Sequence, residues 1–386
     1  MTPEETMAVW QEETAFDEVL LGLRDAISED LEPNLHDIDV NGVYPEAFMR
    51  RVGALGGFRQ GTPVSLGGAG RGIGHTIRVM EEVSKTCLST GFCVWCQTVC
   101  AWYVQNSENE HLKERVLPAV ISGATRGGTG LSNPMKHLFG IERIKLAAER
   151  RLDGYVLDGA IPWISNVDDT GHYFAVVAEI KGEDAYVMAI VPSESEGVTM
   201  RNGGEFIALE GSSTWGWSFK DAFIPEEFVL ASPVQEYIAR IRPGFVLTQT
   251  GIGLGLVDSC IELMKKANKR SEVRQSGVNE FLDDGVEELE ADLDAVRCKI
   301  YALADEIGCD GEDLREGIFE EAVEARLMAS ELSLRASQAT MLHMGAKGYL
   351  LHGAAERKLR ESYFVAIVTP ALKQLRKMLH DMRQTS

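Results

Sequence analysis

The chain has 386 residues, 45% of them hydrophobic and 25% charged, an ordinary composition for a globular protein with two or three cores. Its 38 Lys and Arg against 59 Asp and Glu give a net charge of -21, which repels nucleic acid and anionic lipid and argues against a nucleic-acid partner. No apolar run reaches the roughly 20 residues of a membrane span, and the acidic segment Met1 to Glu13 lacks the basic start of a signal peptide. We therefore expect a cytoplasmic protein that does not enter a membrane.

The first third of the chain is predicted to be helical. Residues 5–27 form an acidic helical segment, residues 37–43 a loop, and residues 45–55 a helix that ends at two glycines. The glycine-rich loop 63–70 follows no clear strand and lacks the Lys-Ser/Thr pair of a phosphate-binding loop. Its pattern is therefore only a weak indication of nucleotide binding.

Helical periodicity continues over residues 73–104, with Glu81 and Glu82 on the polar side. Spacings of three and four residues put three cysteines on one face of this segment: Cys93, Cys96 and Cys100. Such a face suits a metal or redox site only where it meets an open pocket, whereas cysteine among Val and Trp is typical of a packed core. We interpret the three cysteines as core residues.

Strands replace helices near residue 125. Strand composition is found in residues 173–179, 186–191 and 222–225, and residues 154–166 are predicted to be a β-hairpin because Asp158-Gly159 is a turn dipeptide. After residue 231 the chain is helical to its end, with a turn at residues 308–311. Apolar and small residues at steps of four and three predict the seam of a helical bundle: Ile318, Ala322, Ala325, Ala329, Leu332 and Ala336.

Two stretches in the strand-rich part carry the functional signal. Residues 127–134, Gly-Gly-Thr-Gly-Leu-Ser-Asn-Pro, are small and hydroxyl-bearing, and residues 162–165 read Pro-Trp-Ile-Ser. Taken alone, Trp163 is most simply a core residue, since most strand tryptophans serve packing. Together the two stretches resemble the flavin-holding strands of the acyl-CoA dehydrogenase superfamily, and the order of helices, sheet and helices over residues 37–375 resembles that family too.

The resemblance implies an α+β fold of three parts. These are an N-terminal α-helical domain at residues 1–124, a middle β-barrel or sheet domain at 125–230, and a C-terminal four-helix bundle at 231–386. It implies FAD as cofactor and a small-molecule substrate, with acyl-CoA as one candidate. An electron-transfer partner or a flavin reductase is implied as well. Because FAD in this family is shared between subunits, it also implies a homodimer or homotetramer built through the bundle.

The same resemblance assigns cofactor contacts to six residues: Thr129, Leu131, Ser132, Trp163, Ser165 and Arg270. By analogy, Ser132 offers a hydroxyl to the isoalloxazine ring, Trp163 lays its indole beside the ring, and Ser165 places a hydroxyl near N5. Arg270 stands where the family arginine meets the FAD pyrophosphate, a pair of phosphates that suits a guanidinium fork. The turn 345–349 resembles the family's glycine turn near the adenine of a neighbouring subunit.

The chain departs from the family at the catalytic base. The family carboxylate, nine residues after an arginine, removes a substrate α-proton; nine residues after Arg360 stands Thr369, and no Asp or Glu lies between Glu361 and Asp381. Threonine is no base at neutral pH without a second group to deprotonate it. Glu236 is a candidate for a displaced base, and no catalytic residue is assigned.

Three interpretations therefore stay open. The first is a dehydrogenase of an acyl thioester that uses a displaced base. The second is a flavin-dependent monooxygenase of the same fold, which uses reduced flavin and O2 and needs no α-proton base; His343 or His352 would then act beside the flavin. The third is an inactive flavin-binding or assembly subunit. Residues 137–139 replace the family's thioester-holding Gly-Ser-Asp, so the CoA part of the substrate is also open.

Overall fold

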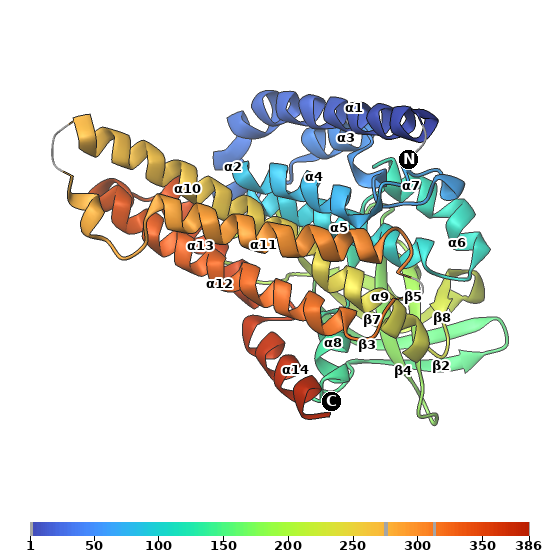
Figure 1. The fold of residues 1–386 in the computed structure, drawn as a ribbon. Coiled ribbons are helices and arrows are strands. Elements are labelled where there is room, and N and C mark those ends of the chain that lie inside the picture. Colours follow the sequence, from blue (N-terminus) through green and yellow to red (C-terminus); the bar gives the residue numbers. More distant parts are fainter. Residues whose placement is uncertain (1–2, 274–276, 312–313, 386) are drawn as a thin grey trace.

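The computed structural model describes residues 3–273, 277–311 and 314–385, and within them helices, a sheet and further helices follow one another (Figure 1). The N-terminal helices are α1 (Pro3–Ala26), α2 (Leu35–Val40), α3 (Glu46–Ala54), α4 (Gly72–Thr86), α5 (Leu88–Gln105), α6 (Glu110–Arg115) and α7 (Leu117–Ile121). The middle part holds β1 (Gly127–Thr129), α8 (Ser132–Leu138), β2 (Leu146–Arg151), β3 (Gly154–Ile164), β4 (Tyr173–Ile180), β5 (Tyr186–Pro192), β6 (Val198–Arg201), β7 (Trp215–Pro225) and β8 (Val229–Ala231). The C-terminal helices are α9 (Gln235–Thr248), α10 (Thr250–Val273), α11 (Val286–Ile307), α12 (Ile318–Met344), α13 (Ala354–Ile367) and α14 (Leu372–Thr385). This order confirms the predicted fold class, while the residue boundaries of the three domains stay predictions.

The strands form one mixed sheet in the order β6-β7-β3-β2-β4-β5-β8, with β1 added in parallel to β4. In the described residues β6 and β8 stand at opposite ends of this order, so the sheet form of the prediction is the one found. Side chains of the sheet make a core of their own, in which Phe174 packs on Trp217 at a centroid distance of 4.7 Å. A second, larger core joins the N-terminal and C-terminal helices.

The predicted hairpin at residues 154–166 is wrong. Residues Gly154–Ile164 form the single strand β3, and its hairpin partner is the preceding strand β2, which pairs with it residue by residue from Leu146 to Arg151. Asp158-Gly159 instead marks a bulge, where the pairing of β3 with β7 shifts register. Gly159 has φ +130°, and a Cβ there would lie 2.4 Å from the carbonyl oxygen of Lys145, so the bulge requires glycine.

Three predictions in the N-terminal third also need correction. The predicted loop 37–43 begins inside α2, and the predicted helix 73–104 is two helices, α4 and α5, separated at Cys87 by extended backbone with φ -141° and ψ 112°. Glu81 and Glu82 do not face solvent: they are 0% and 8% exposed. Their carboxylates are buried because cations from other helices meet them, a contact that local periodicity does not reveal.

The C-terminal helices build the predicted bundle from α10, α11, α12 and α13. All six residues of the predicted small-residue seam on α12 are buried. One helical stretch of the described residues, Gln235–Arg270, is long and apolar enough to cross a membrane, with mean hydropathy 1.3. Because 89% of that window is buried inside the protein, it has the character of a core helix.

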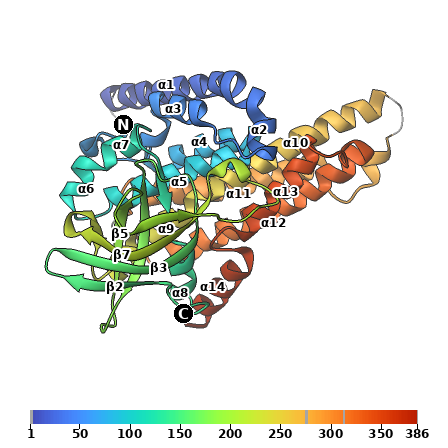
Figure 2. The ribbon, with the colours of Figure 1, turned by 180° about the vertical axis from the view of Figure 1, so that it is seen from behind.

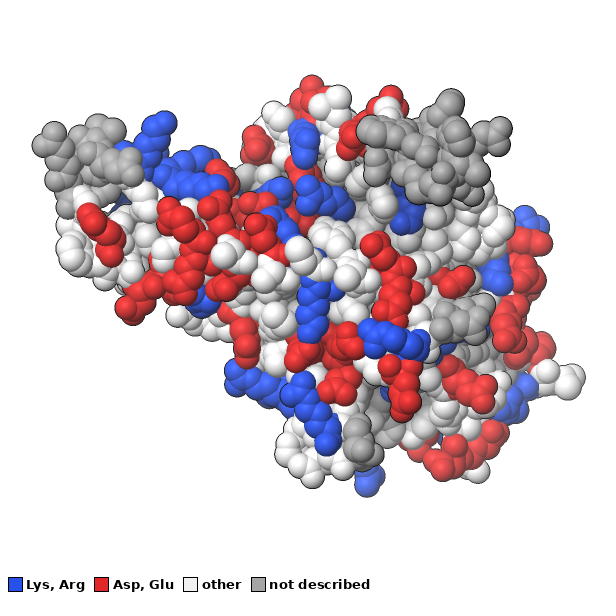
Figure 3. All heavy atoms as spheres, in the orientation of Figure 1, with Lys and Arg blue, Asp and Glu red and all other residues white. Residues whose placement is uncertain are grey.

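The bundle projects away from the sheet, as both ribbon views show (Figures 1 and 2). The N-terminal helices lie along one side of the molecule, and α8 and α14 lie near each other beside the sheet. Acidic side chains predominate on the face drawn in Figure 3, with basic side chains among them, as the net charge of -21 leads one to expect.

Candidate flavin site

The two predicted flavin segments lie side by side. A Cβ on Gly128 of β1 would come within 2.8 Å of the carbonyl oxygen of Ser165, and one on Gly130 within 3.1 Å of the side chain of Ile161 in β3. Only glycine allows this approach. The structure therefore brings the segment that contains Thr129 and Ser132 against the end of the strand that carries Trp163.

A pair of buried amides holds the segments in place. Gln97 of α5 accepts hydrogen bonds from the backbone N–H of Gly127 (2.8 Å) and from Nδ2 of Asn166 (3.0 Å), and Asn166 also donates to the carbonyl oxygen of Gly127 (2.9 Å). Asn166 has φ +68°, a conformation that asparagine tolerates better than most residues, and accepts a hydrogen bond from the Tyr44 hydroxyl (2.7 Å). Sequence analysis missed both amides; the only sequence signal was the position of Asn166 directly after Ser165.

The predicted hydroxyls have defined partners. Thr129 shares a 2.9 Å hydrogen bond with the hydroxyl of Tyr103, whose pKa burial raises well above its usual value. Ser165 is 8% exposed and shares a 2.7 Å hydrogen bond with Thr214. Leu131 is buried, and its backbone N–H points to the Thr129 hydroxyl at 3.4 Å. These contacts fix the backbone and the side chains that the resemblance assigns to the cofactor.

Ser132 meets the position of the missing base. Its Oγ shares a 2.8 Å hydrogen bond with Oγ1 of Thr369, which lies between α13 and α14, and both residues are half-buried. Gln249, at the junction of α9 and α10, donates to the carbonyl oxygen of Thr369 at 2.9 Å. The structure thus places the departure from the family motif directly at the predicted flavin segment, where both hydrogen-bond partners of Thr369, Ser132 and Gln249, are neutral.

Trp163 is not a core residue. Its side chain is 48% exposed, and its Nε1 donates to the carbonyl oxygen of Gly203 at 2.7 Å. The same loop continues to Ile207, which is 72% exposed and whose carbonyl oxygen accepts from Arg360 of α13 at 3.0 Å. A large indole held by its nitrogen with nearly half its surface uncovered has a face available for a flat aromatic ligand.

These residues fit an isoalloxazine ring. A flat aromatic group needs an apolar face and, at its rim, hydrogen-bonding groups for its nitrogens and oxygens. The exposed indole of Trp163 gives the face, and the hydroxyls of Ser132, Ser165 and Thr369 give the rim. No group of three or more metal-ligating side chains occurs within the part of the chain that the structure describes.

Arg270 lies away from these residues. It is exposed in the last turn of α10. The C-terminal end of α10 lies at the tip of the bundle, away from the sheet, in both ribbon views. The turn 345–349 lies at the end of α12, where Tyr349 is 86% exposed. Within one chain the structure does not bring Arg270 together with Trp163, so a contact between Arg270 and the same cofactor requires a second copy.

The other candidates have separate surroundings. Glu236 is exposed on the first turn of α9. His343 is 6% exposed and bonded on both ring nitrogens, to Asn268 Oδ1 (2.9 Å) and the carbonyl oxygen of Asp284 (2.8 Å), so it is a satisfied structural histidine. His352 packs edge-on against His36 at 5.6 Å. The predicted core cysteines are buried and free, and burial raises the pKa of Cys100 to about 12, which makes its thiol inert.

Comparison with known proteins points to one family. Residues 13–124 match the family model of the acyl-CoA dehydrogenase N-terminal domain. A probable acyl-CoA dehydrogenase of Bacillus subtilis is 24% identical over 356 residues, which are 89% of this chain and 91% of that protein. Among solved structures, butyryl-CoA dehydrogenase from Megasphaera elsdenii has a TM-score of 0.84 at 18% identity, covering 96% of this chain and 98% of its own. Dibenzothiophene monooxygenase from Paenibacillus sp. A11-2 has a TM-score of 0.76 at 14% identity, covering 95% and 96%.

Proposed function

The chain belongs to the acyl-CoA dehydrogenase superfamily, and from this membership we propose that it is an FAD-dependent oxidoreductase of a small molecule. The observation that carries the proposal is that the segment after β1, where Ser132 is bonded to Thr369, lies against the end of β3, the strand that carries the exposed indole of Trp163. The proposed localisation is cytoplasmic, and the proposed redox partner is an electron-transfer protein or a flavin reductase.

The residues of this chain have separate tasks in the proposal. Trp163 covers one face of the flavin, Leu131 and Thr129 present backbone and hydroxyl groups to its rim, and Ser165 offers a hydroxyl. Gln97 and Asn166 hold these segments at a fixed separation. When bound, FAD supplies the group that accepts or gives a hydride, and the protein supplies orientation and exclusion of water.

Thr369 decides which chemistry follows. A thioester α-proton needs a base within about 3 Å, and neither Thr369 nor its hydrogen-bonded partner Ser132 ionises at neutral pH. Glu236, the displaced candidate, is exposed on α9 and has no hydrogen bond or ion pair within the described chain. This favours the monooxygenase alternative, in which no α-proton base is needed. An acyl-CoA dehydrogenase with a base elsewhere is the competing proposal.

A second copy of the chain fits the tip of the bundle. The 3₁₀ segment η7 (Val278–Phe281) lies against the end of α12, since Asn279 donates to the carbonyl oxygen of His343 at 3.1 Å. Large apolar side chains there are 61–86% exposed: Val278, Phe281, Leu342, Tyr349, Leu350 and Leu351. An apolar surface of this kind is typical of an interface. We propose that it pairs with a second copy and thereby brings Arg270 to that copy's FAD.

Purified protein tests the proposed cofactor. Protein that binds FAD should be yellow, and excess FAD should raise its melting temperature, because a ligand of the folded state at 100 times its Kd stabilises by about 2.7 kcal/mol. Colourless protein whose melting temperature does not change when FAD is added would refute the proposed cofactor. With a flavin reductase, NADH and O2, product formation that depends on O2 would select the monooxygenase, and its absence together with bleaching by an acyl-CoA would select the dehydrogenase.

A further inference from the structure

Arg326 is a buried cation without a carboxylate. It lies on α12 with 0% exposure, and its guanidinium donates to Oε1 of Gln249 (3.1 Å), to the carbonyl oxygen of Val365 (2.6 Å) and to the hydroxyl of Ser330. Every one of these acceptors is neutral. Burial alone lowers the pKa of Arg326 to about 9, and no Asp or Glu of the described residues forms an ion pair with it.

Two other cations of the described residues are paired with buried carboxylates. Lys358, 1% exposed, meets the equally buried Glu361 at 2.9 Å, and the partly buried Arg297 meets the fully buried Glu81 at 2.6 Å. Such pairing is the rule because an isolated charge in a protein interior loses its hydration without compensation. Arg326 breaks this rule, so its positive charge is left uncompensated by the chain itself.

A structural role accounts for the hydrogen bonds but not for the charge. The carbonyl of Val365 belongs to the last turn of α13, where carbonyls lack helical partners and a donor is favourable. A neutral side-chain amide would serve as a donor there too. The charge therefore needs a separate explanation.

The charge lies directly behind the candidate site. Arg326 binds Gln249, and Gln249 donates to Thr369, whose hydroxyl is bonded to Ser132. A second cation, Arg242 of α9, also packs against α12, where its guanidinium stacks on the ring of Phe319 at 4.1 Å. Arg242 comes seven residues before Gln249 in the chain, and Phe319 comes seven residues before Arg326. Arg242 too has no ion pair in the described residues, and its Nε is buried without a partner. The positive charge of Arg326 thus lies two hydrogen bonds away from Thr369.

We propose that this site takes a substrate that carries a carboxylate, which sits beside Ser132 and Thr369 with Arg326 as its fixed countercharge. In the shared hydrogen bond of the two hydroxyls, only one proton is used, so the other is left to donate to a carboxylate oxygen. Arg326 acts through Gln249 rather than by contact, as a positioning and electrostatic residue. The inference deepens the proposed function and rests on it for the place of the substrate.

Calorimetric titration of the full chain with propanoate and with its neutral isostere propanamide measures the preference. We expect wild type to bind propanoate about tenfold to thirtyfold more tightly, the factor for two unit charges roughly 8–10 Å apart at an effective dielectric constant near 20. Arg326→Gln should abolish this preference, and Arg326→Lys should keep part of it. Arg376→Gln, which removes an exposed arginine paired with Glu331, should leave it unchanged.

A second pair of variants covers the case in which Arg326→Gln fails to fold. Ser330→Asp places a carboxylate beside the guanidinium, whereas Ser330→Asn adds the same volume without charge. We expect Ser330→Asp to lose the preference for propanoate and Ser330→Asn to retain it. A preference that survives in Ser330→Asp, or that wild type never shows, overturns the proposal.

The experiment separates this proposal from the proposed cofactor. Titrations are run with and without added FAD, and FAD binding is followed by its own visible absorbance. Flavin-loaded protein without a preference for propanoate overturns the anion site alone. Colourless protein that still prefers propanoate refutes the FAD proposal and supports the anion site. If inorganic phosphate binds at this site as strongly as propanoate, the site selects negative charge without preferring a carboxylate. That result overturns the assignment of a carboxylate.

Discussion

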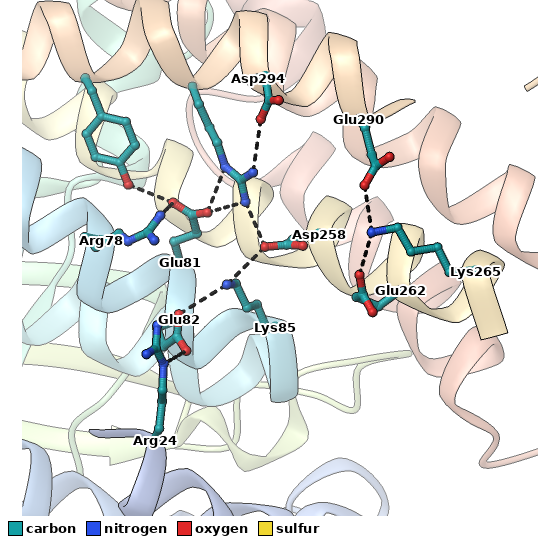
Figure 4. A network of polar contacts seen from close by, with 12 residues as sticks. Arg24, Arg78, Glu81, Glu82, Lys85, Asp258, Glu262, Lys265, Glu290 and Asp294 are labelled. Atoms are coloured by element: carbon teal, nitrogen blue, oxygen red, sulfur yellow. Dashed lines mark hydrogen bonds and ion pairs between the residues drawn. The ribbon is translucent and has the colours of Figure 1, made fainter. Parts of the chain in front are cut away.

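Two buried polar regions of the molecule differ in whether their charged side chains are paired within the chain. Between α4, α10 and α11, Glu81 accepts from Arg297 (2.6 Å) and from the Tyr301 hydroxyl (2.7 Å), and Arg297 also meets Asp258 at 2.8 Å (Figure 4). Between α9, α12 and the turn after α13, Arg326 has neutral acceptors only. Charges that pair within the chain tie helices together, whereas a charge left without a partner is available to a ligand.

The network of Figure 4 should dominate stability. Glu81→Gln keeps the shape of the side chain but leaves Arg297 with less negative charge, and breaking a buried ion pair typically costs about 3–5 kcal/mol. Urea unfolding followed by circular dichroism measures this loss. Flavin absorbance per folded protein should stay unchanged, because none of these residues touches the candidate site. A loss of flavin at full stability would contradict the division into two regions.

A comparison of two tryptophans of the sheet, Trp163 and Trp217, tests the role of the candidate site. Trp163→Ala should weaken flavin retention by at least about tenfold, the factor that 1.4 kcal/mol represents. It should cost little stability, since the indole is already 48% exposed. Trp217→Ala, at a fully buried position, is the matched control and should cost about 3–5 kcal/mol. If Trp163→Ala destabilises as much as Trp217→Ala while flavin affinity is unaffected, Trp163 is a packing residue after all.

Acid should weaken the paired region first. Burial opposes ionisation of Asp258 and Glu82, but the neighbouring cations, Lys85 and Arg297 for Asp258 and Arg24 and Lys85 for Glu82, lower both pKa values below their usual range. A carboxylate with a lowered folded pKa stabilises above its unfolded pKa of about 4, and this contribution is lost as the pH falls through the folded value. The urea concentration at half-unfolding should therefore decrease as the pH is lowered past about 4 in wild type. In Asp258→Asn it should decrease less steeply. Equal slopes would contradict the pairing.

Sequence predicted the parts of the site that consist of neighbours in the chain. Thr129, Leu131 and Ser132 follow one another, and Trp163 and Ser165 share one strand, so a motif can carry them. The contact between Ser132 and Thr369 was not predicted. Counting nine residues from Arg360 identified Thr369, but nothing in the sequence indicates a hydrogen bond to a residue 237 positions away.

The failures have physical reasons. Asp158-Gly159 suits a tight turn and a bulge equally, since both need a residue with unusual φ, and only pairing with β7 decides between them. Glu81 seemed to lie on a solvated face because helical periodicity does not show that Arg297, 216 residues later, covers it. Arg326 gave no signal at all, because arginine in a helix is usually exposed.

The rate at which an acyl-CoA bleaches the bound flavin without O2 tests the central claim most directly. If Thr369 marks a true loss of the base, wild-type protein mixed anaerobically with butanoyl-CoA should show negligible bleaching at the flavin's visible band. Thr369→Glu should then create measurable bleaching only if an acyl pocket is present. Rapid bleaching of wild type would contradict the account and place a base elsewhere, with Glu236→Gln as the next variant to measure.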